Sequence, residues 1–192
     1  MQKIILASQS PRRKQLLEWA EVPFEVIVQS TDESYPADLA IHDVPVHIAL
    51  EKAMGVKRQL EQSPNGLSTM PILAADTIVV LENRIIGKPT DRADAISTLQ
   101  ALSDKHHKVI TGVAILHKQK EVTFYEVTDV CFHPLSTRQI EDYVDKYKPY
   151  DKAGAYAIQE WIGVVGIKRI TGDFYNVMGL PVSRVVQALE LL

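Results

Sequence analysis

The chain has 192 residues, of which 46% are hydrophobic, and a formal net charge of -3. This length and composition allow a substantial core and fit one α/β domain or two lobes. The acidic balance argues against a general polyanion binder, so any basic site must be local. A single cysteine excludes an internal disulfide and a CxxC motif. With no signal-like segment and no apolar stretch of about 18 residues, we expect a soluble, cytoplasmic protein.

Residues 4–7 form a short apolar run that predicts a buried strand, and a helical pattern follows it. Ser10 suits the N-cap of this helix, and Pro11 suits its first position because it lacks the N–H that would be unpaired there. The remaining N–H groups and the helix dipole favour an anion at the strand end. Arg12 and Arg13 lie in this first turn, with Arg13 on the inward side. The segment fits either a phosphate-binding turn or a surface helix whose arginines pair with carboxylates.

Two further segments precede the central part of the chain. Residues 24–28 predict a strand, and the acidic pair Asp32 and Glu33 follows it. Such a pair suits a metal or acid–base site, although ordinary loop chemistry is the simpler interpretation of these residues alone. Residues 44–60 have helical spacing and include Lys52, which by itself is an ordinary solvated lysine.

The strongest core-strand signal is the almost unbroken apolar run 72–81, which follows a predicted loop at 62–71. Asp76 interrupts this run. A carboxylate inside a buried strand is unfavourable unless it is hydrogen-bonded, paired or metal-bound. We therefore assign Asp76 a function. Thr77 beside it either offers a ligand its hydroxyl or is simply a good strand residue.

A hairpin turn at 82–84 leads to a short strand and then to Gly87, Lys88 and Pro89. Gly87 permits close backbone approach, and Pro89 keeps the chain extended so that Lys88 projects. No Walker A pattern surrounds this lysine. A helix is predicted at 92–102.

Residues 108–117 and 121–132 suit an antiparallel pair of strands, and the apolar neighbours of Cys131 predict a core thiol. A helix at 136–147 follows, with Ser136 or Thr137 as its cap. Four of the six histidines lack metal-ligand spacing, so we expect these four on the surface. They are His106, His107, His117 and His133.

A second polar cluster lies in the segment YDKAGAYAIQEW, residues 150–161. Asp151 and Lys152 precede small residues that let a ligand or a second backbone come close. The amide of Gln159 both donates and accepts, which suits the edge of a nucleobase. A tight turn packed on the core explains the same residues. Residues 164–170 predict a strand, and a closing helix follows Pro181.

Most of these charged side chains lie at strand ends or in Gly/Pro turns, where α/β proteins bind ligands. The combination suits a phosphorylated substrate with a divalent cation held by carboxylates. The cations are Arg12, Arg13, Lys52, Lys88 and Lys152, and the carboxylates are Glu33, Asp76 and Asp151.

Six motifs together resemble the Maf family of nucleotide pyrophosphatases. They are LASQSPRRKQLL, AADTIVV, GKP, VITGV, YDKAGAYAIQ and NVMGLPV, and they occur in the family's order across nearly the whole chain. The resemblance implies a single Maf-like domain at 1–192. Its implied fold is an α/β, Maf/ITPase-like arrangement with a mixed, elongated sheet flanked by helices, two lobes and a central cleft. A homodimer is often found in the family.

The resemblance also implies roles for individual residues. Asp76 matches the proposed proton acceptor, while Arg12, Thr77 and Gln159 match positions associated with base selection. The DKAGAYAIQ version is similar to the branch acting on dTTP and UTP. One departure is Lys148, because the family often has glutamate there. Without that glutamate, metal binding depends on Glu33, Asp76 or Asp151.

The resulting hypothesis is a cytoplasmic nucleoside triphosphate pyrophosphatase. It hydrolyses dTTP, UTP and modified pyrimidine nucleotides to the monophosphate and pyrophosphate, a house-cleaning activity on the nucleotide pool. Mg²⁺ or Mn²⁺ held by Asp76 and Glu33 orients a water, and Asp76 directs it at the α-phosphorus. The expected substrate-binding residues are Ser8, Ser10, Arg12, Arg13, Lys52, Thr77, Lys88, Lys152 and Gln159. Two alternatives stay open: a nucleotide- or nucleic-acid-binding regulator of cell division without turnover, and a phosphatase that removes one phosphate.

Overall fold

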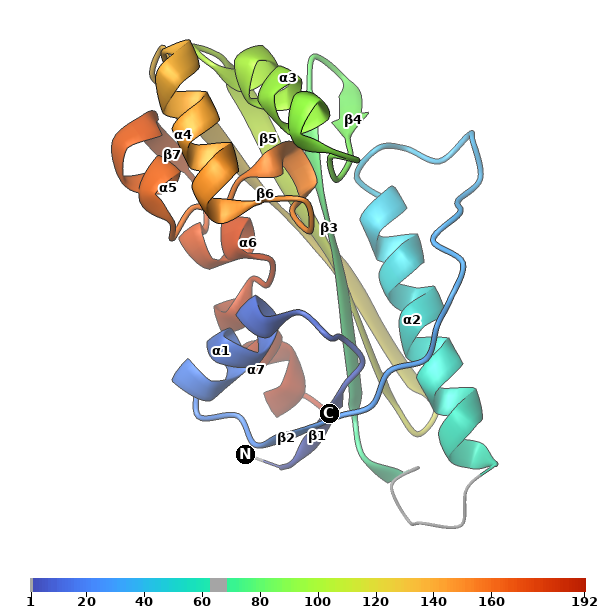
Figure 1. Cartoon of the computed structure of the whole chain (residues 1–192). Helices are drawn as coiled ribbons and strands as arrows, with labels where there is room; N and C mark the ends of the chain where they lie inside the picture. The colour runs from blue at the N-terminus through green and yellow to red at the C-terminus, as the bar shows by residue number, and fades with distance from the viewer. Residues whose placement is uncertain (1, 63–68) are drawn as a thin grey trace. The chain divides into compact units, whose positions relative to one another are not determined.

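The computed structural model describes residues 2–62 and 69–192 (Figure 1). The chain divides into two compact units. The first unit contains the described residues up to Asp76 together with Thr111–Glu126 and Gly179–Leu192. The second contains Thr77–Ile110 and Val127–Met178. Asp76 and Thr77, which are neighbours in the chain, therefore belong to different units.

The described residues form a mixed seven-stranded sheet in the order β2-β1-β3-β5-β6-β7, with β4 paired to β3 outside this path. β1 pairs in parallel with β2 and β3, whereas β4 and β7 pair antiparallel with β3 and β6. This arrangement confirms the predicted mixed α/β class. The strands are β1 (Ile4–Leu6), β2 (Phe24–Val26), β3 (Ile72–Leu81), β4 (Arg84–Ile86), β5 (His106–His117), β6 (Lys120–Phe132) and β7 (Ile167–Thr171).

The first unit has its helices at α1 (Pro11–Trp19), α2 (Val44–Glu61) and α7 (Val182–Glu190). α2 buries an apolar stripe that includes Ala49, Ala53 and Val56 in one cluster with Ile5 of β1. The close packing of α2 on β5 depends on Gly112, since a Cβ there would lie 2.2 Å from the carbonyl carbon of Pro45. Small residues therefore bring the helix that carries Lys52 tightly against the sheet.

The second unit contains α3 (Arg92–Leu102), α4 (Thr137–Tyr147), the 3₁₀ turn η2 (Ala153–Ala155), α5 (Trp161–Gly166) and α6 (Phe174–Met178). α3 packs against both α4 and η2 (Figure 1). A reciprocal capping box starts α4: Ser136 Oγ accepts from Gln139 N, and Gln139 Oε1 accepts from Ser136 N. The capping box fixes the first turn of α4, the helix that carries Tyr143.

Most predicted elements are confirmed, and three predictions need correction. Residues 164–166 belong to α5 rather than to a strand, because Gly163 and Val164 donate their N–H groups to the Glu160 carbonyl. The short helix α6 was not predicted. His107 is 2% exposed rather than on the surface, because it points inward from β5 and packs against Phe132.

Three further expectations concern Cys131, the predicted loop at 62–71 and membrane-spanning helices. Cys131 is buried, as predicted. Residues 63–68 of the predicted loop lie outside the described residues. In the ranges that the structure describes, no helix is long and apolar enough to cross a membrane.

Candidate functional site

The ammonium of Lys52 joins two predicted site carboxylates in the first unit. Its Nζ atom lies 2.7 Å from Glu33 Oε1 and 2.7 Å from Asp76 Oδ1. The Asp76 and Lys52 side chains are only 16% and 18% exposed, whereas Glu33 is 51% exposed. The low exposure makes the pair sensitive to loss of Lys52, because Asp76 would then be a poorly solvated charge. Without Asp76, Lys52 would still face Glu33. The ion pair with Lys52 meets one of the conditions under which a carboxylate is tolerated in a core strand.

The turn after β1 is built around the half-buried Arg13 side chain. Arg13 Nη1 donates to Ser8 Oγ at 3.0 Å, and Arg13 Nε donates to the Gly179 carbonyl at 2.8 Å. Burial lowers the pKa of the Arg13 guanidinium from its ordinary value, while the charges of Asp76 and Glu33 act in the opposite direction. An arginine remains charged despite such a shift. The predicted turn therefore places a fixed positive charge in the electrostatic reach of the Asp76 carboxylate.

Ser10 and Arg12 complete this turn. The Ser10 side chain is the N-cap of α1 and accepts from Arg13 N at 3.5 Å, as the sequence predicts. Ser8 Oγ also accepts from Ser10 N at 3.3 Å. Both hydroxyls thus fix the start of α1. Arg12 follows in the first turn and is half-buried.

Lys152 has carboxylate partners of its own in the second unit. Its Nζ atom lies 2.8 Å from Asp151 Oδ1 and 3.6 Å from Glu160 Oε1. The Lys152 side chain is 10% exposed, and the Tyr143 hydroxyl donates to the other oxygen of Glu160. Lys152 is therefore hydrogen-bonded to Asp151 and forms a longer ion pair with Glu160.

The GKP and DKAGA motifs meet through their backbones. Gly154 N donates to the Gly87 carbonyl at 3.1 Å. Gly154 has φ 71, and a Cβ there would lie 2.9 Å from Val79 Cγ2. The predicted close approach of two backbones is confirmed, and it joins the loops that carry Lys88 and Lys152.

The structure also gives the exposure of the remaining predicted site residues of the second unit. Lys88 follows β4 and is exposed, while Pro89 after it is buried. Gln159 is exposed in the turn after η2, and Thr77 is half-buried in β3. Lys148, where the family often has glutamate, is exposed and ends α4 with φ 45.

Two members of these clusters were not singled out from the sequence. Glu160 looks like any acidic residue before an apolar helix, and only the fold shows its contact with Lys152. Tyr143 was predicted to face inward on α4, but its hydroxyl partner lies 17 positions further along the chain. Contacts of this kind leave no local pattern in a single sequence.

Glu33 and Asp76 are the carboxylates predicted to hold a divalent cation. Within the described residues, no group of three or more His, Cys, Asp or Glu side chains could hold a metal ion. Mg²⁺ commonly binds through one or two carboxylates together with substrate phosphates. Both carboxylates already face a cation, the ammonium of Lys52. Two carboxylates that share one ammonium do not form a metal cage by themselves, so a divalent cation here would need further ligands from the substrate.

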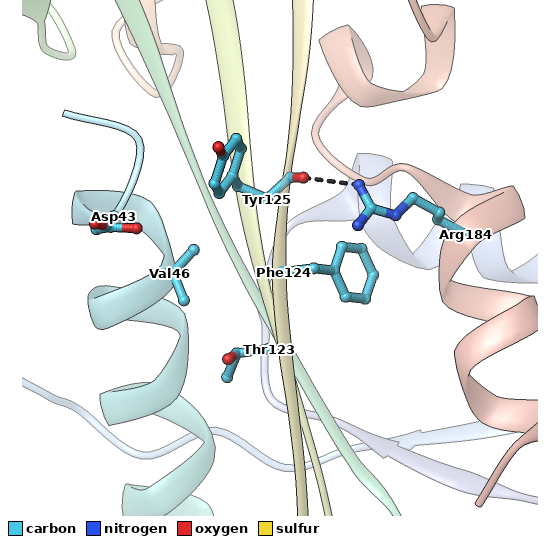
Figure 2. A pocket seen from close by; sticks show the side chains of 6 residues that line it. All are labelled: Asp43, Val46, Thr123, Phe124, Tyr125 and Arg184. Atoms are coloured by element: carbon cyan, nitrogen blue, oxygen red, sulfur yellow. Dashed lines mark hydrogen bonds between the residues drawn. The ribbon is translucent and has the colours of Figure 1, made fainter. Parts of the chain in front are cut away.

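A surface pocket in the first unit is lined by none of the predicted site residues. Its lining consists of Asp43, Val46, Thr123, Phe124, Tyr125 and Arg184 (Figure 2). Arg184 Nη1 donates to the Tyr125 carbonyl at 2.8 Å and to Glu126 Oε2 at 2.7 Å. Its guanidinium also lies over the Phe124 ring, 4.4 Å from the centroid. The charged residues of this lining are one cation and one carboxylate, Arg184 and Asp43, so the lining offers a triphosphate no excess of positive charge.

Comparison with known proteins identifies the family. The chain matches the model of the Maf-like protein family over residues 3–192. It is 49% identical over 187 residues to a dTTP/UTP pyrophosphatase of Cytophaga hutchinsonii, covering 97% of this chain and 83% of that one. It is 47% identical over 189 residues to one of Parabacteroides distasonis, covering 98% and 95%. The chain belongs to the Maf-like protein family, which confirms the resemblance seen in the motifs.

One further relative and one solved structure are also similar to the chain. A dTTP/UTP pyrophosphatase of Bacillus anthracis is 48% identical over 190 residues, covering 99% of this chain and 95% of that one. Among solved structures, the Staphylococcus aureus Ham1 protein is similar with a TM-score of 0.46 at 11% identity, covering 68% of this chain and 72% of that one.

Proposed function

We propose that this protein hydrolyses dTTP and UTP to the nucleoside monophosphate and pyrophosphate. The observation that carries the proposal is the contact of Lys52 with both Glu33 and Asp76, in a chain nearly half identical to proteins named dTTP/UTP pyrophosphatase. Modified pyrimidine nucleotides with the same triphosphate are further substrates under this proposal. Removing them from the nucleotide pool is a house-cleaning activity, which we propose for the cytoplasm.

The proposed chemistry transfers the α-phosphoryl group to water. The water oxygen bonds to the α-phosphorus, the bond to the bridging oxygen breaks, and pyrophosphate leaves. Asp76 accepts the proton that the water loses. Lys52 holds the Asp76 carboxylate in place for this step, since its ammonium lies 2.7 Å from the carboxylate.

Cationic side chains supply most of the remaining stabilisation, because phosphoryl transfer depends mainly on positioning and electrostatics. Arg12, Arg13 and Lys52 in the first unit carry the positive charge proposed to bind the triphosphate. Lys88 and Lys152, which belong to the second unit, are also proposed as substrate-binding cations. Ser8 and Ser10 orient the turn, since their hydroxyls accept from Arg13 and from the backbone at the start of α1.

Base selection is proposed for Arg12, Thr77 and Gln159. The exposed amide of Gln159 offers a donor and an acceptor, as the edge of thymine or uracil requires. Glu33 and Asp76 would hold Mg²⁺ or Mn²⁺ with the substrate, and that cation would neutralise phosphate charge and polarise the reacting bond.

The single-domain organisation and the homodimer belong to the same proposal. The family model runs through both compact units, which supports a single functional domain over residues 1–192. The dimer stays a prediction that sedimentation equilibrium of the purified chain would test.

The test is a product analysis on a panel of nucleoside triphosphates with Mg²⁺ or Mn²⁺. We expect pyrophosphate from dTTP and UTP and little product from purine triphosphates. Running the reaction in ¹⁸O-labelled water identifies the phosphorus attacked: the label enters the monophosphate if water attacks the α-phosphorus. Orthophosphate as the first product would contradict the proposal and support a phosphatase. Tight nucleotide binding without turnover, with a steep and metal-independent salt dependence, would support the regulator.

A further inference from the structure

The Tyr143 hydroxyl connects two parts of the segment that carries Gln159. Tyr143 lies on α4 and is 1% exposed. Its hydroxyl donates to Glu160 Oε2 and accepts from Ala157 N at 3.3 Å. Burial, followed by the bond to Glu160, raises the pKa of Tyr143, so the phenol remains a donor throughout the physiological range. A buried hydroxyl thus holds the residues on both sides of the turn.

The turn between these two contacts has little freedom of its own. Glu160 N donates to the Ala157 carbonyl at 3.1 Å, and Gly163 N donates to the Glu160 carbonyl at 2.9 Å. Gly163 packs directly on the turn, because a Cβ there would lie 1.7 Å from the Ile158 carbonyl oxygen. Ala157 and Ile158 are buried, and Gln159 alone projects between Ile158 and Glu160 as an exposed side chain.

The second oxygen of Glu160 extends this contact to Lys152. Glu160 Oε1 lies 3.6 Å from Lys152 Nζ, while Oε2 accepts from Tyr143. Asp151 lies 2.8 Å from the same ammonium but is 59% exposed, whereas the Glu160 side chain is 21% exposed. Glu160 is therefore the more sheltered of the two carboxylates. It is also the one that α4 holds in place.

We propose that Tyr143 and Glu160 form a positioning pair that fixes Gln159 and Lys152 for recognition of a pyrimidine nucleoside triphosphate. The inference rests on the proposed function. Neither residue is assigned contact with the reacting atoms. Each acts through its neighbour: the hydroxyl through the turn that presents Gln159, and the carboxylate through the ammonium of Lys152.

Replacing Tyr143 by phenylalanine removes the hydroxyl and keeps the ring in the core. In Tyr143→Phe we expect the preference for dTTP over dCTP, measured as the ratio of kcat/KM values, to fall about tenfold. The bases of dTTP and dCTP differ in the hydrogen-bond donors and acceptors along one edge, and the side-chain amide of Gln159 can distinguish them. The loss should lie in KM for dTTP, with kcat within about twofold of wild type. The matched control is Tyr147→Phe, because Tyr147 stacks on Tyr143 from the same helix at 4.9 Å and is expected to leave the ratio unchanged.

Two substitutions at Glu160 separate position from charge. Glu160→Gln removes the charge beside Lys152 but keeps an acceptor for Tyr143, so the preference for dTTP should persist. Glu160→Ala removes the acceptor and should reproduce the effect of Tyr143→Phe. If the pair acts as a unit, the double variant Tyr143→Phe/Glu160→Ala should lose no more selectivity than either single variant.

The outcomes are distinguishable. A wild-type protein that neither hydrolyses nor binds pyrimidine triphosphates would refute the proposed function and, with it, this inference. An active, selective wild type with an unchanged ratio in Tyr143→Phe would refute the inference alone. The same holds if kcat falls equally for dTTP and dCTP with KM unchanged, since that result means only a smaller folded fraction.

Discussion

Asp76 lies in the middle of an apolar strand, and its charge is stabilised there by the ammonium of Lys52. The ammonium contact of 2.7 Å holds the carboxylate in a fixed position. A proton acceptor needs such a fixed position. In the Asp76→Asn variant Lys52 would retain Glu33, so folding should suffer much less than catalysis.

We predict that Asp76→Asn lowers kcat for dTTP hydrolysis by about 10²- to 10⁴-fold, the usual contribution of a general base. The free energy of unfolding should fall by only about 1 kcal/mol. Steady-state kinetics and urea unfolding measure the two effects. Asp129→Asn is the matched control, because Asp129 forms a surface pair with Lys108 at 2.8 Å. Near-normal turnover in a folded Asp76→Asn variant would exclude the catalytic assignment.

His107 shows how burial changes a residue that the sequence placed on the surface. Its Nε2 atom lies 2.7 Å from the Tyr156 hydroxyl, and its ring meets the Phe132 and Tyr156 rings edge-on. Nδ1 has no hydrogen-bond partner among the residues that the structure describes. Burial, assisted by the charge of His106, lowers the pKa of His107 from 6.5 to about 4. The imidazole is therefore neutral in the folded protein at neutral pH.

This shift predicts a loss of stability in acid. Between pH 6.5 and about 4, His107 takes up a proton on unfolding, so the free energy of unfolding falls as the pH falls. The loss is complete below about pH 4 and amounts to about 3 kcal/mol. Urea unfolding at several pH values should show this dependence in wild type and in the exposed-neighbour control His106→Gln, and lack it in His107→Gln. An unchanged slope in His107→Gln would contradict the assignment.

At the scale of elements, the turn η2 depends on one glycine. Gly154 adopts φ 71, and an added Cβ would lie 2.9 Å from Val79 of β3. Gly154→Ala should therefore lower the free energy of unfolding by about 1–3 kcal/mol, from backbone strain and overpacking together. Gly87→Ala is the control, since a Cβ there would meet no atom within 4 Å. Equal urea midpoints for the two variants would show that the close approach is not what stabilises η2.

The elements that could be predicted are those whose signal is local. The apolar run at 72–81 and the caps at Ser10 and Ser136 are set by neighbouring residues, and the structure confirms them. The strand predicted at 164–166 was wrong. Gly163 and Val164 donate their N–H groups to the Glu160 carbonyl, and this helical bonding outweighs the strand preference of the two valines in the segment. In the candidate site, the pairing of Asp76 could be inferred from its unfavourable burial. The contact of Glu160 with Tyr143 could not, because it depends on how α4 packs.

At the scale of the whole molecule, the chain passes between the two compact units four times. It does so at Asp76–Thr77, Ile110–Thr111, Glu126–Val127 and Met178–Gly179. The first three of these bonds lie inside β3, β5 and β6, so three continuous strands contribute residues to both units. Neither unit is a contiguous segment that could be excised. Strands shared in this way couple the stability of one unit to that of the other.

We therefore predict that the two units unfold in a single transition. The chain has two tryptophans, and each unit contains one: Trp19 in α1 and Trp161 in α5. The variants Trp161→Phe and Trp19→Phe leave one fluorescent reporter in each unit. In the background of each variant, the fluorescence midpoint in urea should coincide with the midpoint from far-UV circular dichroism. Adding Gly154→Ala, a change confined to the second unit, should lower the midpoint reported by Trp19 as much as that reported by Trp161. If Gly154→Ala leaves the urea midpoint reported by Trp19 unchanged, the two units fold independently. The single-domain organisation proposed for residues 1–192 would then be wrong.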